Sequence, residues 1–416
     1  MQLRRLLQST VMLAVVTQAG CARTAREQNT QTPLARPHVR HASTSIVVPI
    51  APTVSAAPSV SEAGRSFKVL RSGFSVSRDG PEARMLELGS RLWIMSEYGG
   101  APSPYFAYEW DGTTERDISE EINRHFRGDG NFLSGIASGE AIYLAFGEHT
   151  ERGYYKTTIH RRNKWGWQNL GDPSGFRMST VVGFARADSG CLFVLYTEQD
   201  HHDGDYPQRA KIMTLEGGKR CGKFDLEGGQ ADHTYGSKLL VFPHAFGITR
   251  NGTALVVGSD RKHWACLTFD SAGTRTVVEM PGWIRPDWLL EGMLKPVGED
   301  GWFAAGGAGT VPLLARFTDG EWISQEAPTQ FEISSLSVAP SGELWVTSGS
   351  RARNVTGYPI GQVWRRAPDA AFSRVTLGLG AEEAKVDAFQ VVARGDDDAW
   401  VLAHNDGNGL LLRSVR

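Results

Sequence analysis

One short pattern recurs seven times in this 416-residue chain, and it constrains the fold more than any other feature. Its clearest copy runs from Ala339 to Thr347, where a Pro-Ser-Gly turn is followed by the apolar segment Leu344-Trp345-Val346. Together with the apolar residues 333–338, this copy predicts two antiparallel strands joined by a tight hairpin. Each repeat is therefore expected to contribute at least one hairpin to the fold.

The seven copies follow one another at similar intervals. The residue that aligns with Leu344 falls at positions 92, 142, 192, 254, 302, 344 and 399, a period of about 50 residues. The next residue is aromatic in every copy except the fourth, where it is Leu255. A period of this size indicates stacked supersecondary units that share one core, although the chain length alone would suggest two or three domains.

Further apolar segments in each repeat predict a third and a fourth strand. In the sixth repeat these are residues 362–366 and 372–377, on either side of the turn at Ala367-Pro368-Asp369. Strands such as Cys191 to Tyr196 are apolar at consecutive positions, which indicates that both of their faces are covered. We therefore predict an all-β, seven-bladed β-propeller of four-stranded antiparallel blades over residues 66–416.

The ends of the repeat region predict how the ring closes. The last repeat supplies only three strands, at residues 388–393, 399–403 and 410–415. A strand-like segment from Phe67 to Leu70 precedes the first repeat. Because an open array leaves two bare ends and a ring leaves none, we expect this N-terminal strand to complete the last blade.

The repeats also resemble those of a known group of proteins. Their Gly-x-Leu-Trp-Val pattern is similar to that of bacterial propellers with two-component-regulator and sialidase-like repeats, over residues 66–416. The Asp-box of sialidases is matched only in part, by Asp188 to Phe193, and Arg186 stands where that motif has Ser. The resemblance implies the propeller fold, and it carries no sialidase activity.

The N-terminus predicts export. Residues 1–21 have the pattern of a signal peptide, with Arg4-Arg5 ahead of an apolar stretch. Ala19-Gly20-Cys21 resembles the lipobox of bacterial lipoproteins, which implies lipidation of Cys21 and, because Ala22 follows, an outer-membrane lipoprotein of the cell envelope. Gln18 departs from the Leu or Val that the lipobox favours. The alternative is ordinary cleavage near Ala22, which would leave a periplasmic or secreted protein.

Composition separates a linker from the globular part. Residues 22–65 are rich in Ala, Pro, Thr and Ser and contain no Trp, Tyr or Phe, so we expect a disordered linker. The chain has 44 Lys and Arg against 46 Asp and Glu, and residues 66–416 hold most of the acidic side chains. An acidic globular part argues against a nucleic-acid partner. The basic run Arg161 to Trp165 is expected to form a solvated outer edge.

The cysteines leave their pairing open. Apart from Cys21 there are Cys191, Cys221 and Cys266, so at most one intramolecular disulfide can form. A bond between Cys221 and Cys266 is conceivable if neighbouring blades bring them together, but sequence spacing does not decide it. We expect a monomer without a cofactor.

One face of the predicted propeller is richer in polar loops than the other. The loops between second and third strands and the connections between blades share that face, and here they are the longest polar segments. The candidate ligand-binding residues are Glu148, His149, Arg152, His201, Asp203, Asp205, Tyr206, His263, Trp283, Arg285, Trp288, Arg351, Arg353, Tyr358 and His404.

Two of these groups suggest a particular chemistry. The loop Glu198 to Tyr206 has metal-ligating residue types, but it lacks EF-hand or His-Glu-x-x-His spacing, so we expect a hydrated acidic loop and no metal. Trp283, Arg285 and Trp288 either form a stacking platform for a sugar or peptide or pack over a blade edge.

Three functions remain open from the sequence, and the third of them is a scaffold within an envelope assembly. The first is an envelope-anchored, non-catalytic propeller that binds a protein, peptide or glycan through its loop face, with the membrane contacted only by the lipidated N-terminus. The alternative is a propeller hydrolase or lyase that acts on an extracellular polysaccharide or peptide. Its acid and base would come from among Glu148, His149, Asp203, His233 and His404.

Overall fold

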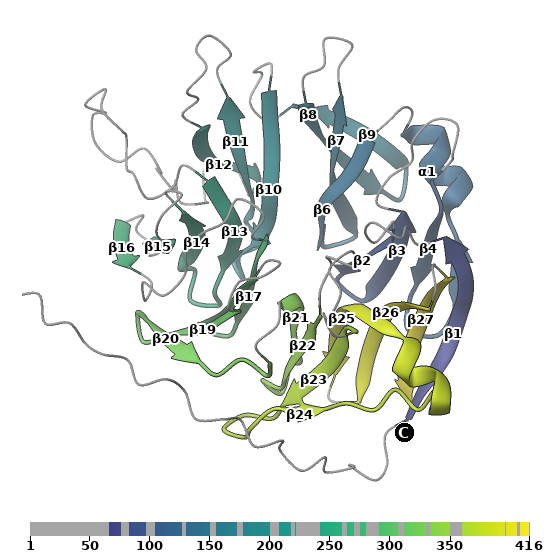
Figure 1. Cartoon of the computed structure of the whole chain (residues 1–416). Helices are drawn as coiled ribbons and strands as arrows, with labels where there is room; N and C mark the ends of the chain where they lie inside the picture. The colour runs from purple at the N-terminus through teal and green to yellow at the C-terminus, as the bar shows by residue number, and fades with distance from the viewer. Residues whose placement is uncertain are drawn as a thin grey trace, which may run out of the picture. The chain divides into compact units, whose positions relative to one another are not determined.

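The described part of the chain forms seven antiparallel sheets (Figure 1). The computed structural model describes residues 66–75, 83–96, 105–126, 130–149, 155–172, 178–199, 208–217, 221, 242–259, 264–269, 275–279, 291–306, 312–329, 333–349, 360–395, 397–405 and 408–415. The expected signal peptide, Cys21 and the linker lie outside these residues. In the described residues, no helix has both the length and the apolar composition that a membrane span needs.

The first four blades follow the chain in order, and each pairs only strands that are consecutive in sequence. Their strands are β2 Ala83–Leu88, β3 Arg91–Ser96, β4 Ala107–Trp110 and β5 Glu115–Asp117 in blade one; β6 Gly130–Ser138, β7 Ala141–His149, β8 Tyr155–Asn163 and β9 Gly166–Gly171 in blade two; β10 Met178–Arg186, β11 Leu192–Gln199 and β12 Gln208–Glu216 in blade three; and β13 Phe242–Ile248, β14 Ala254–Ser259, β15 Trp264–Phe269 and β16 Arg275–Glu279 in blade four.

The last three blades and two short helices complete the described elements. The strands are β17 Glu291–Val297, β18 Asp300–Gly306, β19 Leu313–Thr318 and β20 Glu321–Gln325 in blade five; β21 Ile333–Val338, β22 Leu344–Ser348, β23 Gln362–Arg366 and β24 Ser373–Arg374 in blade six; and β25 Asp387–Gly395, β26 Asp398–Asn405, β27 Asn408–Val415 and β1 Ser66–Ser75 in blade seven. Helix α1, Ser119–His125, precedes blade two, and the 3-10 helix η2, Gly380–Lys385, precedes blade seven.

The predicted seven-bladed propeller is confirmed, and so is its closure. Strand β1 pairs with β27 in an antiparallel ladder from Ser66 opposite Val415 to Ser75 opposite Asn408. Phe67 and Phe74 bury their rings there, and a side chain at Gly409 would collide with the Phe74 ring. The N-terminal strand thus completes the last blade. The blades are four-stranded except that blade three shows three strands among its described residues.

The hydrophobic core lies between neighbouring blades. One cluster joins Met85 and Ile94 of blade one to Trp400 and Leu402 of blade seven, and the other clusters likewise combine residues from adjacent sheets. The second strand of each blade is covered on both faces, which is why its residues are apolar at consecutive positions. The core therefore runs around the ring as a series of inter-blade layers.

The strand directions define two faces of the ring. First strands begin and second strands end on one face, which we call the loop face, and first-to-second-strand hairpins lie on the opposite face, which we call the hairpin face. Several hairpins are closed by only two residues, as between Leu88 and Arg91 or between Val297 and Asp300. Gly89 and Gly298 have φ of 64° and 61°, a backbone that such tight turns require.

Blades five, six and seven share one side-chain arrangement near the hairpin face, which we call the clamp. An acidic residue stands two positions before a second-strand Trp, and an Arg from the third strand lies opposite that Trp, bonds the carboxylate and covers the indole ring. The Arg carbon lies 5.7, 5.8 and 4.8 Å from the Trp ring centroid in the three blades. The sets are Asp300, Trp302, Arg316; Glu343, Trp345, Arg365; and Asp398, Trp400, Arg413.

The position of the clamp shows that the expected alignment of the fifth repeat was wrong by one residue, because Trp302 and not Phe303 corresponds to Trp345. Trp302, rather than Phe303, lies opposite the clamp Arg and packs toward blade six. Phe303 packs with Leu255 of blade four instead. Successive strand residues point to opposite faces, so a shift of one position exchanges the two neighbouring blades that they contact.

Blade three carries a disulfide where the clamp has its acidic residue. Cys191, two positions before Phe193, bonds Cys221 with a Cα–Cα distance of 5.7 Å. The conceivable Cys221–Cys266 bond is therefore wrong. Cys266 is a free thiol on β15, wholly buried between blades four and five, and burial raises its pKa to about 12.

Candidate functional site

The loop face brings the ends of blades six and seven together. Asp387 is the first residue of β25, and His404 stands one residue before the end of β26, so both lie on the loop face. His404 Nε2 donates a hydrogen bond to Asp387 Oδ2 at 3.1 Å. The two side chains are only 8% and 17% exposed, so water screens this contact weakly. A buried imidazole paired with a carboxylate is thus built into this face.

A glycine from blade six completes this arrangement. The Gly361 N–H donates to Asp387 Oδ1 at 2.8 Å, and the Ala388 N–H donates to the Gly361 carbonyl at 3.0 Å. A side chain at residue 361 would collide with the Ala388 carbonyl and with Asp387. Only glycine allows so close an approach of the two backbones. The loop-face group of Gly361, Asp387 and His404 therefore joins two blades through backbone and side-chain contacts.

Asp387 and His404 form a hydrogen-bonded carboxylate–imidazole pair. An imidazole that donates through Nε2 to a carboxylate keeps a fixed tautomer. The other ring nitrogen, Nδ1, is buried, so a ligand or reacting group would contact the pair only if this nitrogen became accessible. Over the described residues, no three His, Cys, Asp or Glu side chains lie close enough to hold a metal ion.

The described residues include few of the candidates chosen from sequence. His404 lies in the loop-face group, and Glu148 is half-buried near the end of β7, with Lys156 as its cross-strand neighbour. His149 is the last residue of β7, and the structure describes only its backbone. The remaining candidates lie outside the described residues: Arg152, His201, Asp203, Asp205, Tyr206, His263, Trp283, Arg285, Trp288, Arg351, Arg353 and Tyr358.

Sequence reasoning missed Asp387 and Gly361. Both follow turns or loops of ordinary composition, and no motif marks either of them. One signal was present, because Asp387 immediately precedes the predicted first strand of the last repeat and therefore had to reach the loop face. His244 lies in β13, and burial lowers its pKa to about 4.

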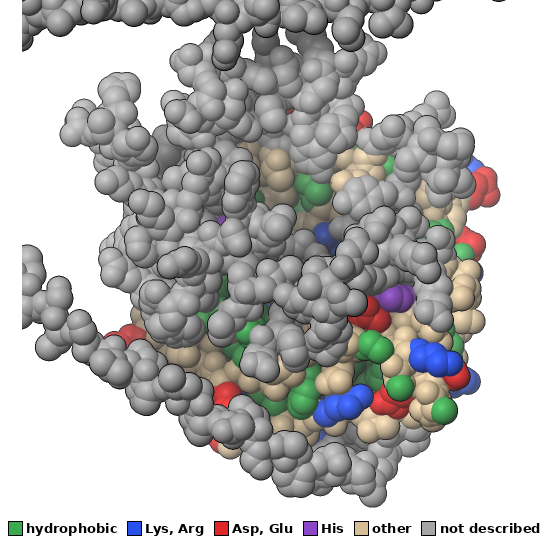
Figure 2. Space-filling model, in the orientation of Figure 1, with side chains coloured by type: hydrophobic (Ala, Val, Ile, Leu, Met, Phe, Trp, Pro, Cys, Tyr) green, Lys and Arg blue, Asp and Glu red, His purple; other side chains and the backbone are tan. Residues whose placement is uncertain are grey.

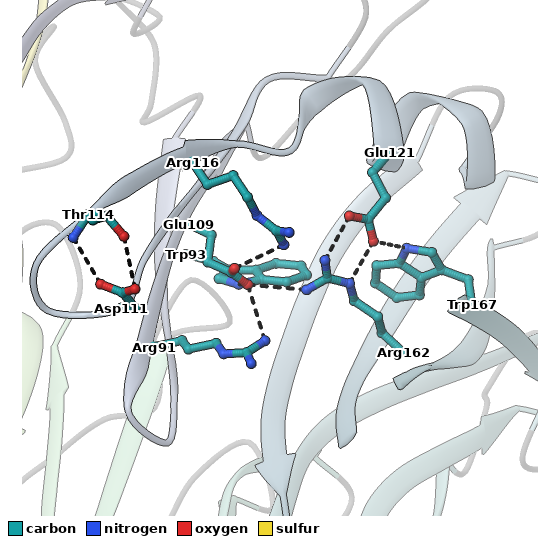
Figure 3. Close-up of polar contacts among 9 residues, drawn as sticks. All are labelled: Arg91, Trp93, Glu109, Asp111, Thr114, Arg116, Glu121, Arg162 and Trp167. Carbon is teal, nitrogen blue, oxygen red and sulfur yellow. Dashed lines mark hydrogen bonds and ion pairs between the residues drawn. The ribbon is translucent and has the colours of Figure 1, made fainter. Parts of the chain in front are cut away.

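A second polar group lies between blades one and two (Figure 3). The Glu109 carboxylate accepts from Trp93 Nε1 at 2.8 Å and pairs with Arg116 at 2.9 Å, Arg162 at 3.1 Å and Arg91 at 3.5 Å. On the other side of Arg162, Glu121 of α1 accepts from Arg162 Nε at 2.6 Å. Trp167 Nε1 also donates to Glu121, at 2.8 Å.

The blade one–two network corrects the expected solvated basic edge at Arg162, whereas Lys164 and Trp165 of the same run are exposed as expected. The Arg162 side chain is only 12% exposed and bridges two carboxylates, whereas Trp165 in the adjoining turn is 82% exposed. Buried ions need such compensation, because removing a charge from water costs several kcal/mol. The network therefore holds α1 and β8 on blade one. At the next turn, backbone N–H groups of Thr114 and Thr113 hold the pKa of Asp111 well below its usual range.

The surface in view mixes charges of both signs. Figure 2 shows basic and acidic side chains interspersed among the coloured residues, without an extended area of one sign. Such a surface has no strong field to select a partner by charge alone.

Comparison with known proteins adds likenesses at the level of the fold. No protein-family model matches the chain. No curated protein matches it either. Among solved structures, a prolyl endopeptidase matches with 12% identity and a TM-score of 0.49, over 82% of this chain and 50% of the endopeptidase. This chain thus spans about half the length of that enzyme.

Two further structures have similar scores. YCF48, in a structure bound to a D1 peptide, matches with 12% identity and a TM-score of 0.48, over 88% of this chain and 100% of YCF48. The extracellular domain of a hybrid two-component system from B. thetaiotaomicron matches with 12% identity and a TM-score of 0.49, over 84% of this chain and 39% of that chain. At this identity such likenesses concern fold alone.

Proposed function

We propose that this protein is a non-catalytic binding propeller outside the cytoplasm, which recognises a protein, peptide or glycan through its loop face. The contrast between the two faces carries the proposal. Two-residue turns close hairpins on the hairpin face, whereas residues 200–207 and 349–361 separate second from third strands on the loop face. Loops held by a rigid scaffold are where binding residues of such folds concentrate.

The path of β1 supports a role for the loop face in binding. Ser66 pairs with Val415, so the chain enters the propeller at the hairpin face and β1 runs toward the loop face. If Cys21 carries a lipid, the linker of residues 22–65 joins the membrane to the hairpin face, with an r.m.s. reach of roughly 35 Å. The loop face would then be free to meet a ligand away from the membrane.

The disulfide is consistent with the proposed location. The Cys191–Cys221 bond is of a kind that persists in oxidising compartments and is rare in the cytosol. Lipid anchoring is a separate part of the proposal. Metabolic labelling with palmitate should mark the wild type and leave Cys21→Ser unlabelled, and an unlabelled wild type would leave only the secreted or periplasmic form.

Loop replacement tests the binding proposal. Residues 200–207 and 350–359 would each be replaced by a Gly-Ser segment of equal length, and proteins and glycans captured from envelope extracts would be quantified by mass spectrometry. We expect each loop variant to capture at least tenfold less of the ligand than the wild type does. The matched control replaces Gly89-Ser90 on the hairpin face with Asn-Gly, which suits the same turn. Equal capture by loop and hairpin variants would contradict the proposal.

The Asp387–His404 pair favours a second candidate function, a propeller hydrolase or lyase. In this alternative His404 acts as a general base that Asp387 orients, at their 3.1 Å contact. Incubation of envelope polysaccharide and peptide fractions with wild type and His404→Asn would test it by product analysis. Products formed by the wild type alone support the enzyme, and binding without turnover supports the leading proposal.

A further inference from the structure

Two histidines meet where α1 lies on blade two. His125 is the last residue of α1, and its Nε2 lies 2.8 Å from Nδ1 of His160 on β8, with the two rings almost perpendicular at 88°. The other nitrogen of His160 lies 2.8 Å from the Thr158 hydroxyl. A hydrogen bond between two imidazoles needs an N–H on one ring and a lone pair on the other. The pair is therefore intact when it shares a single N–H.

Aromatic side chains enclose the histidine pair. His160 is 5% exposed, and the Phe126 ring lies 4.6 Å from it. Trp167 stacks on His125 at 5.0 Å with an interplanar angle of 17°. Burial, and secondarily repulsion from His125, lowers the pKa of His160 to about 4, and burial also lowers the pKa of His125. Both rings are consequently neutral at pH 7.

The surrounding charges are few and mostly paired with one another. On α1, Glu121 favours the charged form of His125, but it is bonded to Arg162 of β8. Glu120 and Arg124 of α1 pair with each other, 2.6 Å apart. The other described charged groups on β4, β7 and β8 are Glu109 and Arg161, which have their own partners, and Lys156 and Glu148 at the far end of the β7–β8 ladder. Tyr143 of β7 bonds Glu216.

We infer that the His125–His160 pair is an acid-sensitive catch that holds α1 on blade two. A first proton can enter on the Nδ1 side of His125 and leave the hydrogen bond between the rings in place. A second proton must go to His160 Nδ1, and two N–H groups would then face each other across 2.8 Å. Two like charges at this distance, one of them on the buried His160, repel strongly, so the doubly protonated pair has to separate.

Separation would release α1 from its core contacts. Ile122 and Phe126, which are 0% and 3% exposed, anchor the helix in the same cluster as Trp93. The pKa of His160 is lower in the closed state than the usual 6.5, so the closed state loses stability as pH falls from about 6.5 toward 4. The equilibrium constant for opening is expected to rise on the order of a hundredfold across this interval. Acid would thereby expose an apolar surface at this edge.

Hydrogen exchange of the full-length protein tests the catch. The amides of Ile122 and Phe126 donate to carbonyls within the helix and report its opening. We expect their protection factors, corrected for the intrinsic pH dependence of exchange, to fall between pH 7 and pH 4.5 in the wild type. In His160→Asn the side-chain carbonyl can still accept from His125 Nε2 and cannot titrate. Protection in this variant should change less than threefold.

His244→Gln is the matched control, because His244 is also buried with a pKa of about 4 but lies in blade four. It should keep the wild-type pH dependence at α1. The inference is overturned if α1 protection is independent of pH in the wild type, or if it falls equally in His160→Asn. If His160→Asn loses protection throughout the molecule at pH 7, His160→Gln, whose side chain also cannot titrate, replaces it with the same expected result.

Discussion

Blade three and blades five to seven fill the same place in the repeat with different chemistry. In blades five to seven the residue two positions before the clamp Trp is acidic and holds an Arg over the indole ring. In blade three that residue is Cys191, bonded to Cys221, and the aromatic residue is Phe193. Both solutions tie the start of the second strand to a later part of the blade, one by charge and one by a covalent bond.

Blade one shows that the clamp depends on its geometry and tolerates an exchange of charges. Arg91 stands two positions before Trp93, and Glu109 takes the place of the third-strand Arg. Blade four has Leu255 opposite Thr268, so its described residues form neither a clamp nor a disulfide at this place. The residue at this position, an aromatic or Leu255, packs toward the next blade in every blade, so one inter-blade contact recurs while its surroundings vary.

The clamp aromatic itself should give the largest effect. Trp345→Ala removes a side chain that is 1% exposed, so the free energy of unfolding should fall by about 3–5 kcal/mol. Trp165→Ala is the control, because that ring is 82% exposed and its loss should change stability by less than about 0.5 kcal/mol. Chemical denaturation measures both. Similar losses in the two variants would show that the inter-blade contact is not what stabilises the ring.

The disulfide of blade three should come next. Cys191→Ala with Cys221→Ala is expected to cost about 3 kcal/mol, because the bond closes a loop with a sequence separation of 30 residues. Thermal unfolding with and without reductant checks this. Reductant should lower the Tm of the wild type and of Cys266→Ala, and leave the double variant unchanged. If reductant leaves the Tm of the wild type unchanged, the disulfide does not contribute the expected stability to blade three.

Burial should decide how much each clamp charge contributes. Glu343 and Arg365 are each 9% exposed, so Glu343→Gln should cost about 3 kcal/mol by leaving a buried cation without its charge partner. Asp398 and Arg413 are each 30% exposed, and Asp398→Asn should cost less than about 1 kcal/mol. Double-mutant cycles with Arg365→Met and Arg413→Met would measure the two couplings. Equal coupling energies for the two ion pairs would contradict the expectation that burial sets how much each pair contributes to stability.

Blade four should contribute a smaller, pH-dependent term. Burial holds the pKa of His244 at about 4, below its unfolded value of about 6.5, so the wild type should lose stability as pH falls from 6.5 to 4. His244→Gln should remove at most about 2 kcal/mol of that loss. The difference between the two denaturation profiles at pH 7 and pH 4.5 is the measurement. Parallel profiles would mean that His244 does not titrate in this range.

The sequence by itself determined the number of blades, the antiparallel hairpins and the closing strand. These follow from local patterns, such as the turn before Leu344 and the aromatic at Trp345, which recur because each blade packs on the next in the same way. The candidate site was predicted less well. His404 was chosen for its residue type and its place at a strand end, and the same place on β25 could have indicated Asp387.

Only the tertiary structure decided which distant groups meet. The Gly361–Asp387 contact, the Cys191–Cys221 bond, the burial of Arg162 and the register of Trp302 each depend on how separate segments pass one another. A periodic apolar pattern specifies which face of a strand is buried, because the hydrophobic effect acts on area and has no direction. Hydrogen bonds, ion pairs and disulfides need partners within a few ångströms, and that information lies in the folded ring.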